Sequence, residues 1–258
     1  MIETLEYYPH AELMGLKAGM EPIPEIASIE GWQNVPIVEN REPLVALQKY
    51  QGRRLAISPQ YFIHGFRNAS FEQEIRAGVF ERLLLAAEAL PADYRLVIWD
   101  AWRSAELQKE IYDRYYAQLY AQFGALGPDQ LGQLCQQFVA LPSVDPTKPS
   151  HHLTGGAVDV TIMDDFGQEL WMGTGFDDFS EKSHTRYFEN EENCISERDD
   201  EARRNRRILN DAMCAVGMFT GLATEWWHFQ LGTQAHGITT NQNAEYGIPK
   251  NKRRGGDV

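Results

Sequence analysis

Cysteine is scarce in this chain. Three residues, Cys135, Cys194 and Cys214, are scattered along 258 positions, and no CxxC pair occurs. This odd, scattered set excludes a disulfide framework and argues against a cysteine-rich zinc site. Cys135 and Cys214 fall in apolar helical patterns, which predicts core positions rather than nucleophiles. A chain of this length can bury enough surface to fold without disulfide bonds.

Positive charge is also in short supply. The chain has 24 Lys and Arg residues against 37 Asp and Glu residues, a net charge of −13. Binding to nucleic acid and docking on anionic lipid both depend on basic residues, so the composition argues against both kinds of partner. An acidic surface attracts cations, including metals and ammonium groups, although solubility accounts for most of the excess.

Long apolar runs are absent. No stretch of 18 or more apolar residues occurs, so the sequence predicts no membrane span. The first residues, MIETLEYYPHAELMGLKAG, contain neither the basic segment nor the apolar segment of a signal peptide. We therefore expect a cytoplasmic protein, and no pattern in the sequence indicates its oligomeric state.

Helical and strand-like segments follow one another without regular alternation. Apolar spacing and capping signals predict four helices: Ser70 to Leu90, Ser104 to Gly124, 127 to about Leu141, and Arg198 to Val216. Ser70 and Gln73 have the spacing of a capping box at the start of the first helix, and Gly217 ends the last. β-Branched and aromatic runs predict three strands: Tyr94–Trp99, Ala157–Ile162 and Thr224–Leu231. This order favours an α+β fold, a single domain with a small, largely antiparallel sheet and flanking helices.

The composition also suggests a division of the chain. Residues 1–50 are rich in Pro and Glu and are interpreted as an N-terminal arm with short strands, packed on the domain. We assign residues 51–240 to the main domain and residues 241–258 to a C-terminal tail.

Two short segments concentrate residues that could bind a metal. The first is SHHLTGGAVD, from Ser150 to Asp159, and the second is EWWH, from Glu225 to His228. Imidazole and carboxylate groups are ligands that suit zinc. The Gly-Gly pair disfavours a helix, so we expect His152 on a loop that bends close over the metal and Asp159 on the strand that follows.

Three ligands, His152, Asp159 and His228, would leave a fourth tetrahedral position for water, as in catalytic zinc sites. Bound zinc lowers the pKa of water to about 7 and polarises a carbonyl. Glu225 would be the general base that takes the proton of that water and passes it to the leaving amine.

Each segment alone has a simpler interpretation, because a single histidine or a tryptophan pair usually belongs to a core or a surface. We assign His10, His64 and His236 to that ordinary role, and we expect His151 to face outward beside the ligand. Glu225 and His228 present a geometric problem, because residues three apart on a strand point to opposite faces. Either a bulge re-aims one of them, or Glu225 precedes the strand.

Both segments resemble the SxHxxGxAxD and ExWH signatures of the D-alanyl-D-alanine dipeptidases of the vancomycin-resistance type and their wider zinc peptidase family. The segment from Trp99 to Arg103 is similar to that family's WDxYR stretch. The run MGTGFD, from Met172 to Asp177, followed by Ser183-His184, resembles its MGxxFD…SH loop, and Asn205-Arg206-Arg207 resembles its NRR helix start. The likeness covers roughly residues 70–232.

The resemblance implies a fold shared with D,D-carboxypeptidases and the hedgehog signalling domain. It implies one zinc ion per chain on His152, Asp159 and His228, with Glu225 as the base. It assigns Arg103 to stabilising the tetrahedral oxyanion, Ser150 to substrate binding, and Asp177 to the free amino group of a dipeptide. A surface ion pair for Arg103 and a loop-capping role for Asp177 are the structural alternatives.

Some positions depart from the family pattern. Ser104 stands where the family often has Pro, and His151 stands where the vancomycin-resistance enzymes carry Ser. The family's Tyr- and Asn-Phe-bearing segment is not evident in Leu55–Arg67, and the N-terminal arm is longer. These departures bear on the substrate more than on the zinc chemistry.

The sequence therefore predicts a zinc-dependent enzyme that hydrolyses D-alanyl-D-alanine or a related D,D-dipeptide. One alternative is a D,D- or L,D-carboxypeptidase that acts on peptidoglycan stem peptides. The absence of a signal peptide and the amine-pairing role of Asp177 count against it. The other alternative is a non-catalytic zinc-binding module, against which Glu225 and Arg103 count.

Overall fold

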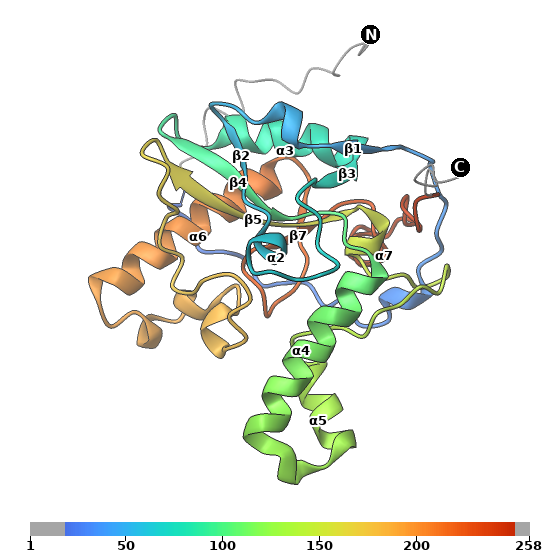
Figure 1. Cartoon of the computed structure of the whole chain (residues 1–258). Helices are drawn as coiled ribbons and strands as arrows, with labels where there is room; N and C mark the ends of the chain where they lie inside the picture. Colours follow the sequence, from blue (N-terminus) through green and yellow to red (C-terminus); the bar gives the residue numbers. More distant parts are fainter. Residues whose placement is uncertain (1–18, 251–258) are drawn as a thin grey trace.

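A five-stranded mixed sheet lies at the centre of the computed structural model, which describes residues 19–250 (Figure 1). Its strand order is β2-β4-β5-β7-β6. The strands are β2 (Leu55–Ile57), β4 (Tyr94–Asp100), β5 (Ala157–Asp164), β6 (Phe219–Thr220) and β7 (His228–Gln230). Only the β2–β4 pair is parallel among these neighbours, which confirms the predicted small, largely antiparallel sheet.

Two long helices cover one face of this sheet. Helix α3 (Ala77–Ala89) packs beside α6 (Glu197–Ala215), and they contact β4 and β5 respectively. The main core lies between the helices and the sheet, where Val158, Val160 and Ile162 of β5 are fully buried. Successive strand residues point to opposite faces, so Asp159 lies on the face away from this core. The site is built on that second face.

A helical hairpin projects from the body of the molecule (Figure 1). It consists of α4 (Ala105–Phe123) and α5 (Pro128–Cys135), which enclose a second, smaller core with Tyr61 and Val139. The predicted start of α4 is confirmed, because the Ser104 hydroxyl accepts a hydrogen bond from the Leu107 amide. Helix α5 ends at Cys135 rather than near Leu141, and an irregular segment carries the chain onward.

The remaining regular elements are short. They are a two-stranded sheet of β1 (Leu44–Ala46) and β3 (Glu74–Arg76), helices α2 (Gln60–Ile63) and α7 (Gln234–Thr240), and 3-10 helices that include η1 (Trp32–Asn34) and η4 (His152–Thr154). Together these elements confirm the predicted α+β class.

The predicted helix start at Ser70 is wrong. Residues Glu74–Arg76 form β3 against β1, and the helix begins at Ala77. The Gln73 side chain accepts a hydrogen bond from the Ala101 amide (3.0 Å) and donates one to the Ser70 carbonyl (2.9 Å). The Gln73 side chain is therefore engaged in a long-range contact with Ala101 and does not form the capping box that the local pattern predicted.

Two further predictions are revised. Cys135 is buried as expected, but Cys214 is exposed. Gly155 and Gly156 pack against neighbouring segments. Gly155 adopts φ +73°, and a Cβ on it would lie 2.6 Å from the Leu44 side chain, while a Cβ on Gly156 would lie 2.6 Å from the Leu231 carbonyl oxygen, so neither position has room for a side chain.

Segments from both ends of the described chain lie side by side. The Val38 amide donates to the Ala244 carbonyl (2.7 Å), and the Asn40 amide donates to that of Glu245 (3.0 Å). Tyr246 is buried and donates its hydroxyl to Glu42 (2.9 Å). The proposed division at residues 50 and 240 stays a prediction, and His10 lies outside the described residues. Within residues 19–250, no helix is both long and apolar enough to cross a bilayer.

Candidate active site

Three neighbouring strands bring charged side chains together on the face away from the main core. Asp159 of β5 is the register partner of His228 on β7 and of Asp100 at the end of β4. Directly opposed residues on antiparallel strands point to the same side of the sheet. The register shifts between Ile98 and Asp100, which marks a bulge at the end of β4. The sheet itself therefore places Asp159 next to His228.

His152 reaches this cluster from η4, immediately before β5. Its Nδ1 lies 2.8 Å from the Ala101 carbonyl oxygen. A carbonyl can only accept, so Nδ1 carries the proton and the lone pair of Nε2 faces the other two side chains. The backbone is tied down as well, because the Arg103 amide donates to the His152 carbonyl (3.2 Å). Hydrogen bonds thus fix both the orientation and the tautomer of His152.

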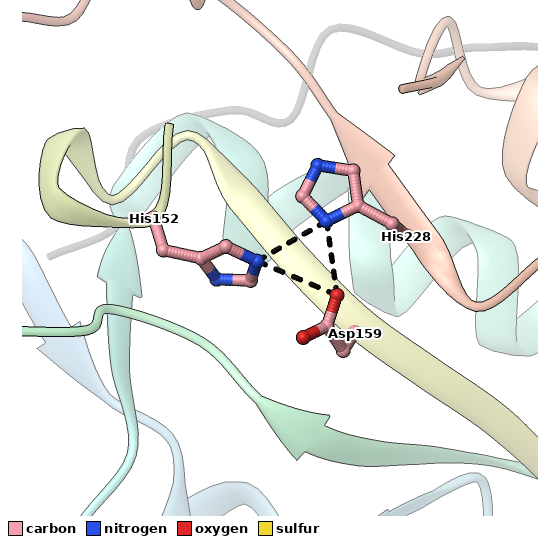
Figure 2. Close-up of side chains that lie close together, drawn as sticks. All are labelled: His152, Asp159 and His228. Carbon is pink, nitrogen blue, oxygen red and sulfur yellow. Dashed lines mark hydrogen bonds and ion pairs between the residues drawn. The ribbon is translucent and has the colours of Figure 1, made fainter. Parts of the chain in front are cut away.

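Figure 2 shows the three side chains converging on one point. His152 Nε2 lies 3.1 Å from His228 Nδ1 and 3.4 Å from Asp159 Oδ1, and His228 Nδ1 lies 3.0 Å from Asp159 Oδ1. All three residues are buried. Two ligands of a tetrahedral zinc ion, each about 2.0–2.1 Å from it, lie roughly 3.3–3.4 Å apart. The spacing of these atoms therefore fits a single small cation.

The donor chemistry fits a metal ion too. His152 donates its distal N–H to a carbonyl, an arrangement that usually accompanies metal-ligating histidines. Burial acts to raise the pKa of Asp159, but the neighbouring histidines hold that pKa below its usual range, so the carboxylate is ionised. His152 presents Nε2 to the cluster and His228 presents Nδ1, while His228 Nε2 is buried without a hydrogen-bond partner among the described residues. The cluster thus combines an anion with one inward-facing nitrogen from each imidazole.

Glu225 lies in the turn before β7, which resolves the geometric problem in favour of the second alternative. The backbone turns there, with the His228 amide donating to the Glu225 carbonyl (3.3 Å). Glu225 Oε2 comes within 3.9 Å of His228 Nδ1, and its side chain is 12% exposed. Burial raises the pKa of Glu225 well above its usual value, and Asp159 and Asp177 add to that shift while Arg103 opposes it. A carboxyl with high proton affinity therefore stands beside the three converging side chains.

Arg103 is held by hydrogen bonds on all its nitrogens. Nε donates to Asp100 Oδ2 (2.9 Å), Nη2 to Asp159 Oδ2 (3.0 Å) and Nη1 to Gln108 Oε1 (2.9 Å). The residue is buried, and it lines the same cavity as the three ligand candidates. A guanidinium has five N–H groups, so two stay available for a bound molecule. Burial raises the pKa of Asp100 to about 6, against the opposing effect of Arg103.

Asp177 stands in the long connection between β5 and α6, with φ +52°. It lines the cavity, and burial raises its pKa to about 7, with Arg103 opposing the shift and Asp159 adding to it. A non-glycine residue in the left-handed region is uncommon, and such strain often accompanies functional positions. Asp177 and the candidate ligands therefore share one site.

The cavity has a volume of about 140 Å³ and combines polar and apolar walls. Ser150 and His151 line it, and the Ser150 hydroxyl accepts a hydrogen bond from the Ser143 amide (3.0 Å). The expectation that His151 faces outward is wrong, because its ring packs edge-on against Trp32 and contributes to the cavity wall. His64 is exposed and His236 is half-buried, and neither lines this cavity.

Two residues at the site were not identified in the sequence. Tyr61 is buried under Arg103, whose guanidinium carbon lies 4.9 Å from the ring centre. It comes from Leu55–Arg67, the segment in which no family tyrosine was evident. Trp32 belongs to the N-terminal arm. Neither position carries a local signal, because only the fold brings these segments to the cavity.

Comparison with known proteins assigns the chain to a family. A sequence model of the peptidase M15 family, described as D-Ala-D-Ala dipeptidase, matches residues 79–246. The chain belongs to this family. It is 30% identical over 222 residues to a D-alanyl-D-alanine dipeptidase of Synechocystis sp., covering 81% of this chain and 89% of that protein. It is also 39% identical over 127 residues to a D-alanyl-D-alanine dipeptidase of Escherichia coli, covering 48% of this chain and 55% of that protein.

Two solved structures are more distantly similar. They are a vancomycin-resistance D,D-pentapeptidase VanY variant in complex with Zn(II), at 19% identity, and VanYB in complex with D-alanine-D-alanine, at 20% identity. Each aligns with 69% of this chain and with 85% or 84% of its own, at a TM-score of 0.40. The family membership therefore rests on the sequence matches, and this member of the M15 family is a peptidase.

Proposed function

We propose that this M15 family member is a zinc-dependent D,D-dipeptidase that hydrolyses D-alanyl-D-alanine or a closely related dipeptide. The convergence of His152, Asp159 and His228 beside Glu225 is the observation that carries the proposal. The activity of the curated relatives, D-alanyl-D-alanine dipeptidases, supports the choice of substrate.

His152, Asp159 and His228 would hold the zinc ion. When bound, the ion would supply Lewis acidity, which polarises the scissile carbonyl and lowers the pKa of a water molecule. Glu225 would accept a proton from the attacking water and deliver it to the nitrogen of the leaving residue as the peptide bond breaks. A neighbouring dication would offset the burial that raises the pKa of Glu225, so the carboxylate would be available as a base.

Arg103 would act on charge in two ways. Its Nη2 group orients Asp159, and its two remaining N–H groups would face the oxyanion that develops on the scissile carbonyl. Three carboxylate-bearing or amide-bearing neighbours fix the guanidinium, so little reorganisation is needed during the reaction. Ser150 would contribute a hydroxyl to substrate binding at the rim of the site.

Metal content is the first test. We expect the purified protein, reconstituted with zinc, to retain one zinc ion per chain, and His228→Ala to lose most of it. His236→Ala is the matched control, because that histidine lies away from the cavity and should leave the zinc content unchanged. Elemental analysis after dialysis measures both. A wild-type protein without metal after reconstitution would contradict the proposed site.

Asp177 is the basis for choosing a dipeptidase over a carboxypeptidase. A dipeptidase must recognise a free ammonium group close to the scissile bond, whereas a carboxypeptidase must leave that side open for the rest of the chain. Asp177 is the carboxylate that would pair with the ammonium in the confined cavity. An N-acetylated peptide has no such charge and would leave the carboxylate unpaired.

We therefore expect the wild-type enzyme to hydrolyse D-alanyl-D-alanine at least about 100-fold more efficiently than its N-acetyl form. Asp177→Asn should lose most of that preference, because the amide cannot form the ion pair. Asp165→Asn, on an exposed turn, is the control and should keep it. Values of kcat/KM for the two peptides provide the test. Equal hydrolysis of both peptides by the wild type would favour the carboxypeptidase alternative.

A further inference from the structure

The N-terminal arm contributes a wall to the cavity. Trp32, in η1, lines the same cavity as the three ligand candidates, although it lies outside residues 79–246 that match the family. The centre of its ring lies 4.7 Å from that of the His151 ring, and the two rings pack edge to face. The arm is therefore part of the site and not only an addition to its exterior.

Hydrogen bonds from α7 hold this part of the arm. The buried side-chain amide of Gln234 donates to the carbonyls of Val35 (2.7 Å) and Thr147 (3.0 Å), with a longer contact to that of Gln33 (3.4 Å). A single side chain thus joins the arm to the loop that leads to His152. Gln234 binds backbone carbonyls of both the arm and the loop, and backbone groups are less mobile than side chains. These hydrogen bonds therefore fix the position of the segment around Trp32 relative to the site.

A row of rings connects the arm to the candidate ligands. The centres of His151 and His228 are 6.4 Å apart, and those of His228 and His152 are 4.9 Å apart. His151 Nε2 has no hydrogen-bond partner among the described residues, so packing against Trp32 contributes to holding this ring. Consecutive Cα atoms of a peptide are about 3.8 Å apart. If the scissile bond lies beside His152, Asp159 and His228, the residue that follows it would therefore reach the rings of His151 and Trp32.

The charges of the cavity give a bound dipeptide a direction. Asp177 lines the cavity and interacts with Arg103 and with the Tyr61 side chain. An ammonium group is favoured on this acidic side. The ring contacts of His151 are instead with Trp32 and His228, which carry no carboxylate. The leaving residue, whose carboxylate is repelled by Asp177, would then face His151 and Trp32.

We propose that Trp32 and His151 form the wall of the subsite for the leaving residue, and that Trp32 limits the size of that residue's side chain. This inference rests on the proposed dipeptidase function and adds a specificity-determining residue from the arm. Trp32 is a rigid, bulky side chain on a backbone segment that Gln234 holds in place, so it would exclude a large side chain by steric contact. His151 would be positioned by Trp32 and would complete the same wall.

The test compares D-alanyl-D-alanine with D-alanyl-D-phenylalanine. We expect the wild-type enzyme to favour the first by at least about tenfold in kcat/KM, the scale of discrimination by steric fit in a pocket. Trp32→Ala should lower this ratio about tenfold or more, mainly by improving KM for the larger peptide. His151→Ala should lower it in the same direction, and the double variant should fall short of the product of the two effects, because the rings act as one unit. Val38→Ala, an exposed substitution in the same arm, should leave the ratio unchanged.

Two measurements separate this inference from loss of structure. Zinc content should stay at the wild-type value in every variant, and Trp32→Leu, a smaller truncation, should give an intermediate ratio. Equilibrium binding of both peptides to Glu225→Gln protein, measured before the slow residual hydrolysis consumes them, should show the same ranking. A ratio that Trp32→Ala and Trp32→Leu leave unchanged would overturn the inference while leaving the dipeptidase function intact. If the wild-type enzyme hydrolyses neither peptide, the proposed function itself fails.

Discussion

Replacing Glu225 with glutamine should lower kcat for D-alanyl-D-alanine by a factor of about 100 to 10,000 while zinc stays bound. The amide is nearly the same size as the carboxyl but cannot accept the proton of the attacking water. Zinc should be retained because Glu225 stands 3.9 Å from His228 Nδ1, beside the three converging ligands rather than among them. Glu225→Ala should give a loss of similar size.

The measurement combines steady-state kinetics with elemental analysis of the same samples. Glu181→Gln, at an exposed position of a 3-10 helix in the connection that carries Asp177, is the matched control and should keep wild-type kcat. Joint loss of zinc and activity in Glu225→Gln would make Glu225 a ligand. Unchanged kcat with zinc in place would remove it from the reaction altogether.

Local signals in the sequence were sufficient for the elements that depend on local contacts. The Ser104 cap of α4 and the end of α6 just before Gly217, which has φ +80°, depend on contacts within a few residues, and both predictions are confirmed. The capping-box pattern at Ser70 was an equally strong local signal. The Gln73 side chain instead accepts a hydrogen bond from the Ala101 amide, and the residues that follow form β3, which pairs with β1. Tertiary hydrogen bonds decided that boundary, and the sequence carries no direct record of them.

The candidate site divides in the same way. Residues within the two motifs were identified because their types and spacing are informative, and the strand register then explains why Asp159 meets His228. The position of Glu225 could not be predicted, because a sequence of four residues does not distinguish a turn from a strand. The backbone of the folded structure shows that Glu225 lies in a turn before β7. Trp32 and Tyr61 could not be identified, since an aromatic residue in an arm or a short helix is ordinary until the fold brings it to the cavity.

Arg103→Ala should have the second large effect, on turnover and on stability together. Arg103 is the cation that neutralises the buried Asp100 and Asp159, at 2.9 and 3.0 Å. Removing one partner of a buried ion pair leaves an uncompensated charge, which typically costs about 3–5 kcal/mol. The free energy of unfolding should fall by that order in the zinc-free protein, and less when zinc balances Asp159.

The kinetic effect of Arg103→Ala should appear mainly in kcat, as a loss of roughly 100-fold or more, because an oxyanion donor acts chiefly in the transition state. Arg103→Lys tests the geometry separately from the charge. An ammonium group on a flexible stem cannot serve Asp100, Gln108 and Asp159 in fixed directions, so the lysine variant should recover stability better than it recovers kcat.

Arg114→Ala is the matched control for these variants. Arg114 also pairs with an acid, Glu110, and packs over an aromatic ring, but it is partly exposed and lies outside the cavity. Its loss should change kcat by less than about twofold because it lies outside the cavity, and it should lower the free energy of unfolding by only about 0–1 kcal/mol because the ion pair is partly exposed. Chemical denaturation with and without zinc, together with separate kcat and KM values, distinguishes the roles of Arg103. A change confined to KM would reassign Arg103 to ground-state substrate binding, and a loss of zinc with normal kcat in the loaded fraction would limit it to orienting Asp159.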